Sequence, residues 1–81
     1  MSPARLKPTS KGAAARAWRE RVKLSPQDLA DRSGYSLEAV YQFERGKRSD
    51  GSEHSEWAWQ RYQLCCAAVE HQLKTGKEFQ W

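Results

Sequence analysis

The stretch from Ser25 to Arg48, SPQDLADRSGYSLEAVYQFERGKR, constrains the fold of this chain more than any other. Ser25 can cap a helix, and Pro26 suits the first helical position because its missing N–H would have no partner there. We expect this helix to end at about Ser33, since Gly34 readily takes the left-handed conformation that ends a helix. The first half of the stretch therefore predicts one short helix that stops at a glycine.

The second half of the stretch predicts another short helix with one apolar side. Ser36 can cap this helix, and Gly46 is expected to end it. Val40 and Phe43 are three residues apart, so they share the face that packs inward. Ala30 of the preceding helix is small enough to let the two helices cross closely. Two short helices joined by a tight glycine turn form the helix-turn-helix arrangement.

The residues on either side predict further helices, and hence an all-α, compact four- to five-helix bundle. A helix is expected to begin near Thr9 or Ser10, with Trp18 as the bulky anchor of its apolar face and Gly12 as a weak point near its start. The composition after Arg48 predicts a loop and then a C-terminal helix over about 53–75, which begins near Ser52 or Ser55 and stops at Gly76. The expected parts are a flexible basic arm (1–10), a helix-turn-helix domain (11–75, with the motif at 25–46) and a C-terminal tail (76–81).

The C-terminal helix carries more apolar residues than one narrow stripe can hold. One face is marked by Trp57, Leu64 and Ala68. The other has the alternating spacing of a short coiled-coil seam and comprises Trp59, Tyr62, Cys66, Val69 and Leu73. We predict that this seam, together with Phe79 and Trp81 of the tail, forms a homodimer. The alternative is that the seam completes the core of the monomer.

Charge is unevenly distributed along the 81 residues, which carry a net charge of +4. Residues 1–23 hold seven Lys or Arg and one acid, whereas residues 49–81 hold three bases and five acids. The excess of Lys and Arg in residues 1–23 suggests that one side of the protein faces a polyanion. An ordinary solvated surface is the alternative explanation.

Several classes of function lack support in the sequence. No apolar run approaches a membrane span and no signal peptide is visible, so a cytoplasmic location is expected. Cys65, Cys66, His54 and His71 do not have the spacing of a zinc site, and we interpret them as small buried thiols and surface histidines. No nucleophile motif, carboxylate pair or phosphate loop is present. The sequence therefore predicts no enzyme, no cofactor and no small-molecule ligand.

The run WRERVKLSPQDLADRSGYSLEAVYQFERGKR resembles the Cro/phage-repressor (XRE) helix-turn-helix family over about residues 14–48. The matching positions are Trp18-Arg19-Glu20, Leu24-Ser25, Leu29-Ala30, Gly34, Val40 and Phe43-Glu44-Arg45-Gly46-Lys47. The resemblance implies a bundle of four or five helices that binds double-stranded DNA, usually as a dimer. Two positions depart from the pattern: Pro26 stands where many members have glutamine, and Lys23 where glycine is usual.

If the second helix of the motif enters the major groove, its outward face reads bases. Gln42 could pair with adenine, Glu38 could accept from cytosine, and Arg45 could reach guanine or phosphate. Leu37 and Tyr41 could contact a thymine methyl group. The alternative is an ordinary solvated helix surface.

Phosphate contacts are expected from helix ends and nearby polar side chains, namely Gln27, Arg32, Ser36, Lys47 and Arg48. The basic residues Arg5, Lys7 and Lys11 could enter an adjacent minor groove. A disordered arm that serves only solubility is the alternative for these three.

The resulting functional hypothesis is a sequence-specific transcriptional regulator, most simply an autorepressor on an inverted-repeat operator. The resemblance points to regulators of phages or mobile elements, including those that accompany anti-CRISPR genes. A protein-interaction module is the alternative, for instance an antitoxin that uses the aromatic C-terminal half. RNA binding ranks third, because no sheet is expected that could stack bases.

Overall fold

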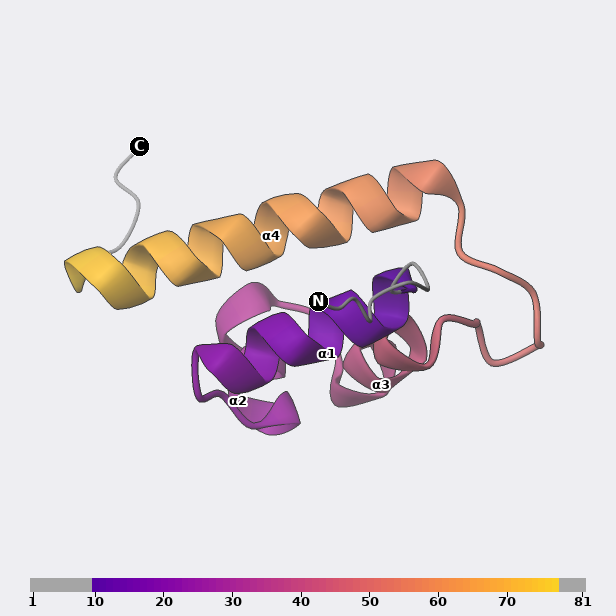
Figure 1. Ribbon diagram of the computed structural model, residues 1–81, viewed down its shortest axis with the longest axis horizontal. Helices are drawn as coiled ribbons and strands as arrows, with labels where there is room; N and C mark the ends of the chain where they lie inside the picture. Colours follow the sequence, from indigo (N-terminus) through magenta and orange to yellow (C-terminus); the bar gives the residue numbers. More distant parts are fainter. Residues whose placement is uncertain (1–9, 78–81) are drawn as a thin grey trace, which may run out of the picture.

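The computed structural model describes residues 10–77, which fold into four helices (Figure 1). The helices are α1 (Lys11–Arg21), α2 (Pro26–Ser33), α3 (Leu37–Arg45) and α4 (Glu56–Thr75). This confirms the all-α fold and the helical bundle. Within residues 10–77 there is no strand, and a single isolated bridge joins Lys47 to Glu53. The predicted arm up to residue 9 and the tail from residue 78 lie outside the described residues.

Each helix begins at a serine cap. The hydroxyl oxygens of Ser10, Ser25, Ser36 and Ser55 each accept a hydrogen bond from the backbone N–H three residues later. At α2 this becomes a full capping box, because Asp28 also accepts from the N–H of Ser25 at 3.2 Å. Of the two predicted starting points for the C-terminal helix, Ser52 and Ser55, the structure uses Ser55, so α4 begins at Glu56.

The two helices of the motif end as the sequence predicted. Gly34 and Gly46 adopt φ values of 85° and 87°, in the left-handed region that favours glycine. At both sites the glycine N–H donates to a carbonyl of the last helical turn, which satisfies an otherwise orphaned acceptor. The short lengths of α2 and α3 are thus set locally, by a serine before each helix and a glycine after it.

The core lies where α3 packs against α1 and α2, and α4 runs along the bundle and contacts α2 (Figure 1). Leu29 and Val40 are completely buried between α2 and α3. From α4, Tyr62 stacks on Phe43 with ring centroids 4.1 Å apart, and Trp59 meets the same Phe43 edge-on at 5.1 Å. An aromatic cluster therefore fastens α4 to the motif.

This packing places the predicted α4 seam inside the monomer. Trp59, Tyr62 and Val69 are buried in the chain's own core, and Cys66 and Leu73 pack against it. Buried side chains present no surface to a second copy, so the alternative, completion of the monomer core, is what the structure shows for this seam. The opposite face is the one left open, with Trp57 74% and Leu64 66% exposed. Phe79 and Trp81 lie outside the described residues.

α1 and α3 approach each other so closely that only glycine fits at one position. A Cβ on Gly12 would lie 2.5 Å from the carbonyl oxygen of Glu44 and 2.9 Å from that of Phe43. The sequence prediction treated Gly12 only as a weak point of the helix. The structure corrects this, because the missing side chain lets the backbone of α1 lie against the end of α3.

Candidate nucleic-acid interface

A buried ion pair holds the C-terminal end of α3 against α1. Arg19 Nε donates to Glu44 Oε2 at 2.6 Å, and its NH2 group donates to Glu44 Oε1 at 3.1 Å. Arg19 NH1 also donates to the carbonyl of Leu24 at 2.9 Å, so the guanidinium links three segments. Hydrogen bonding to Glu44 raises the pKa of Arg19. Because both side chains are only 9% exposed, the pair fixes the position of α3 in a region that excludes water.

The inner face of α3 is held by apolar and aromatic contacts. Val40 is fully buried and Phe43 is 6% exposed. The imidazole of His54, from the loop before α4, stacks on Phe43 at 4.2 Å, and its Nε2 lies 3.0 Å from the carbonyl oxygen of Gln42. The prediction of a surface histidine is therefore wrong for His54, which is half-buried against α3, whereas His71 is exposed.

The opposite face of α3 is open to solvent. Glu38 and Arg45 are exposed, and Tyr41 is 49% exposed. Gln42 is half-buried, and no residue within 10–77 hydrogen-bonds its side-chain amide. α3 thus combines an inner face fixed by the core with an outer face that carries hydrogen-bonding and aromatic groups.

A comparison with models of known protein families found one match to this part of the chain. Residues 16–49, from within α1 to just past α3, match the model described as a helix-turn-helix. Residues 16–49 form an XRE-type helix-turn-helix. Members of this family are DNA-binding transcription regulators, and that coarse function follows for the segment. No curated protein and no solved structure matched the chain.

Leu37 fits the predicted base-contact set of the XRE-type motif least well. It is half-buried and packs against the core cluster, so only part of its side chain remains available. The other four predicted base-contact residues, Glu38, Tyr41, Gln42 and Arg45, lie on the outer side of α3 as described above. Four of the five therefore share one accessible face.

The predicted phosphate contacts lie at the start of α2, at the turn between α2 and α3, and just after α3. Arg32, Lys47 and Arg48 are exposed and form no ion pair with any residue of 10–77. Gln27 is exposed, and its amide donates to Asp31 at 2.9 Å. The hydroxyl oxygen of Ser36 already accepts from the helix at 3.0 Å. Within residues 10–77, arginine and lysine at the end of α2 and just after α3 therefore remain free for an anionic partner.

Lys11 differs from the other predicted phosphate contacts. Its Nζ lies 3.2 Å from the carboxylate of Glu56 and 5.9 Å from the ring centroid of Trp59, so it points towards α4. The structure thus groups Lys11 with α4 and not with the outer face of α3. Arg5 and Lys7 lie outside the described residues.

Within residues 10–77, no cluster of three or more His, Cys, Asp or Glu could hold a metal ion, and no helix is long and apolar enough to cross a bilayer. Cys65 and Cys66 are half-buried free thiols. Burial, with Cys65 and Glu44 as smaller contributors, raises the pKa of Cys66 to about 12, so this sulfur remains a protonated thiol at neutral pH.

Sequence reasoning missed three residues that position the interface: Arg19, Gly12 and His54. Arg19 was matched only as part of the family pattern, and its pairing with Glu44 depends on the way α1 and α3 cross. A glycine inside a helical run was the one available signal for Gly12, because such a glycine often has a packing reason. Nothing in the local pattern around His54 indicates an aromatic partner eleven residues earlier in the chain.

Proposed function

We propose that the chain is a transcriptional repressor that binds an inverted-repeat operator as a homodimer, with α3 in the major groove. The observation that carries the proposal is the two-sided character of α3. Its inner side is fixed by the Arg19–Glu44 pair and by Phe43, whereas Tyr41 and Arg45 stand on the open side. A rigidly held helix with an accessible polar face is what base recognition in a groove requires.

The outer face offers complementary base chemistry. The Gln42 amide can donate to N7 and accept from N6 of adenine, and the Arg45 guanidinium can donate to two acceptors of guanine. Tyr41 supplies an aromatic edge that suits the thymine methyl group. Glu38 either accepts from cytosine N4 or serves only the N-terminal end of α3, where an acid is favoured.

The arginine and lysine side chains in and directly after the motif supply the phosphate contacts. Arg32, Lys47 and Arg48 have no acidic partner within residues 10–77, so DNA phosphates need not displace an internal partner. Phosphate contacts set register and affinity, whereas the α3 face sets sequence preference.

The dimer is assigned to the outer face of α4, since the predicted seam belongs to the core. Trp57 and Leu64 are seven residues apart, two helical turns along the same face, and Ala68 continues it. Within residues 10–77 they are, with Tyr41, the large apolar side chains that are exposed. An antiparallel α4 pair centred on Leu64 would be self-complementary, as a two-fold interface must be.

The proposal is tested by selecting bound sequences from random DNA and measuring the affinity of the selected site at several salt concentrations. We expect an inverted repeat, and an affinity that falls steeply with salt because phosphate binding releases counterions. Placing the selected site over a reporter promoter should lower transcription. No salt-sensitive DNA binding would contradict the proposal.

Sedimentation tests the dimer separately. Leu64→Glu should give a monomer, whereas Ala17→Glu, the same charge at an exposed position of α1, should leave the dimer intact. A Leu64→Glu protein that remains dimeric would contradict the assignment to this face.

A protein-interaction module is the second candidate, favoured by the same exposed Trp57 and Leu64. An antitoxin-like chain would use this face for a different protein. It would sediment as a monomer by itself and would show no selected DNA site.

A further inference from the structure

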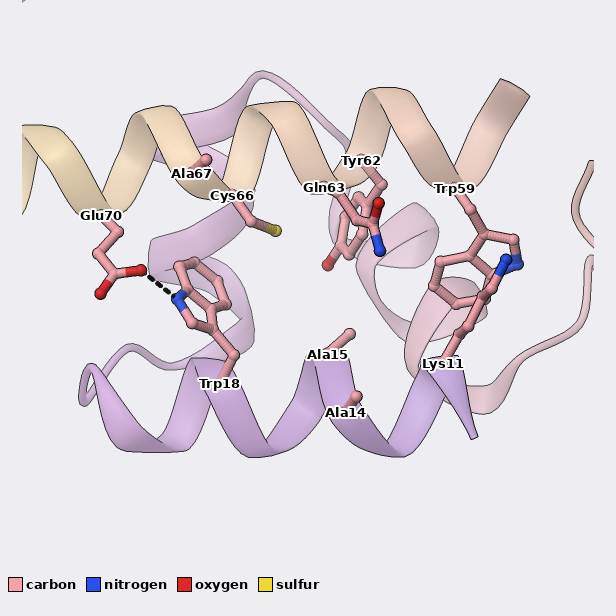
Figure 2. Close-up of a pocket in the computed structure, with 10 residues that line it drawn as sticks. All are labelled: Lys11, Ala14, Ala15, Trp18, Trp59, Tyr62, Gln63, Cys66, Ala67 and Glu70. Carbon is pink, nitrogen blue, oxygen red and sulfur yellow. Dashed lines mark hydrogen bonds between the residues drawn. The ribbon is translucent and has the colours of Figure 1, made fainter. Parts of the chain in front are cut away.

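A groove of about 370 Å³ runs between α1 and α4, away from the outer face of α3 (Figure 2). Its walls are mostly apolar, and their apolar part comprises Ala14, Ala15, Trp18, Trp59, Cys66 and Ala67. Two alanines on α1 leave the space open, and an indole ring stands towards either end. The volume lies at the lower end of the range for small-molecule sites, roughly 300–1,000 Å³. It is too small for a partner helix about 10 Å across.

The hydroxyl of Tyr62 is an unsatisfied polar group in this groove. Tyr62 is 1% exposed, and its hydroxyl has no hydrogen-bond partner within residues 10–77. Figure 2 shows the hydroxyl directed from α4 towards α1, with the Gln63 amide turned into the same space. A buried hydroxyl without a partner is destabilising, and a ligand that accepts a hydrogen bond from it would remove this cost.

Two of the polar groups that remain available in the groove, Tyr62 and Lys11, can donate, and the Gln63 amide can both donate and accept. Burial, above all, raises the pKa of Tyr62, so its hydroxyl stays protonated and can donate. Lys11 brings a positive charge beside Trp59, and its present partner Glu56 is 89% exposed, so this ion pair is weak and easily exchanged. The one carboxylate that lines the groove within residues 10–77 is already engaged, because Glu70 accepts from Trp18 Nε1 at 2.9 Å and pairs with Lys74 at 3.3 Å.

From this arrangement we infer that the α1–α4 groove binds a small planar aromatic carboxylate. The ring would lie against the indoles and the alanines, and the carboxylate would accept from Tyr62 and face the ammonium group of Lys11. A cationic ligand would meet an ammonium group and a hydroxyl donor. An uncharged ligand would forgo the attraction to Lys11.

The test is titration of the ¹⁵N-labelled full chain with phenylacetate, phenylacetamide and phenethylamine, which differ in charge around the same ring. Phenylacetate should bind saturably and shift the indole N–H resonances of Trp18 and Trp59 more than that of exposed Trp57. Phenylacetamide should bind more weakly, and phenethylamine should leave these resonances unchanged. Equal binding of the amine, or no saturable shift with phenylacetate, would overturn the inference.

Three variants locate the site. Tyr62→Phe keeps the ring stack on Phe43 and should weaken phenylacetate binding roughly tenfold, the effect of one hydrogen bond to a charged group. Lys11→Gln should weaken it roughly two- to fivefold, as for an exposed ion pair. Tyr35→Phe removes the same hydroxyl from a ring that does not line the groove and should leave phenylacetate binding unchanged. Unchanged affinity in Tyr62→Phe would also overturn the inference.

One further variant tests whether the chain's own tail fills the groove. The double substitution Phe79→Ser and Trp81→Ser should leave the Trp18 and Trp59 resonances of the ligand-free protein in place. If it moves both, the tail is the occupant and the aromatic carboxylate is not.

Discussion

Arg19 of α1 and Glu44 of α3 form a two-point ion pair, with N–O distances of 2.6 and 3.1 Å, in a region where each side chain is only 9% exposed. Glu44 lies in the last turn of α3, and Arg45, proposed to read a base, follows it directly. The pair therefore connects the stability of the fold to the placement of the recognition surface.

Removing one partner of this pair should be costly. Glu44→Ala leaves the Arg19 guanidinium buried with a single carbonyl partner, and we expect a loss of about 3–5 kcal/mol in the free energy of unfolding. Arg16→Ala breaks the exposed pair with Glu20 and should cost only about 0.3–0.5 kcal/mol. Urea denaturation of both variants provides the measurement, and equal losses would contradict this view of the buried pair.

Gly12→Ala should destabilise the protein although alanine is the better helix former. The added Cβ meets the Glu44 carbonyl oxygen at 2.5 Å, and overpacking of this kind costs about 1–3 kcal/mol. At Ala17, which is exposed on the same helix, replacement by glycine should cost about 1 kcal/mol through propensity alone. A rise in the melting temperature of Gly12→Ala would show that α1 and α3 do not approach so closely.

Lys23→Gly should stabilise the protein. Lys23 has φ of 65°, in the left-handed region where a non-glycine residue costs about 1–2 kcal/mol. Glycine relieves this strain and loses about 0.5–1 kcal/mol of chain entropy, so a small net gain is expected. Arg21→Gly, inside α1, should instead lower the melting temperature. The strain also explains the glycine that is usual at this position in the family pattern.

Gln42 and Lys47 should contribute to DNA binding in different ways. Gln42→Ala should lose about 1–3 kcal/mol of preference at one or two base positions per half-site. Lys47→Ala should weaken binding to all sequences and reduce the salt dependence by about one counterion. Competition binding against a panel of altered sites separates the two effects. A Gln42→Ala protein with unchanged preference would mean that another face of α3 reads the DNA.

Acid should disrupt the link between α1 and the end of α4. The hydrogen bond from Trp18, followed by that from Lys74, holds the pKa of Glu70 below its usual range. This contribution to stability is complete above the pKa of an unperturbed glutamate and is lost as the pH falls through the lower, folded-state value. The Trp18 indole N–H resonance should therefore titrate with a depressed midpoint. Glu70→Gln should abolish that titration, and a midpoint at or above the ordinary value would contradict the assignment.

The helix-turn-helix could be predicted from local sequence signals. The ends of α2 and α3 are set by two serines and two glycines, Ser25, Ser36, Gly34 and Gly46. Each forms hydrogen bonds to backbone groups three or four residues away, so its effect is local and can be predicted from the sequence. The spacing of Val40 from Phe43 then identified which side of α3 turns inward, and the resemblance to the XRE pattern followed from the same residues.

The tertiary structure alone decided which face of α4 is buried. Two apolar stripes compete along that helix, and the one that fits around Phe43 enters the core, leaving Trp57 and Leu64 outside. The Arg19–Glu44 pair and the groove beneath Tyr62 likewise join residues that are far apart in the chain. Such contacts depend on crossing angles between helices, and no periodicity within a single helix encodes them.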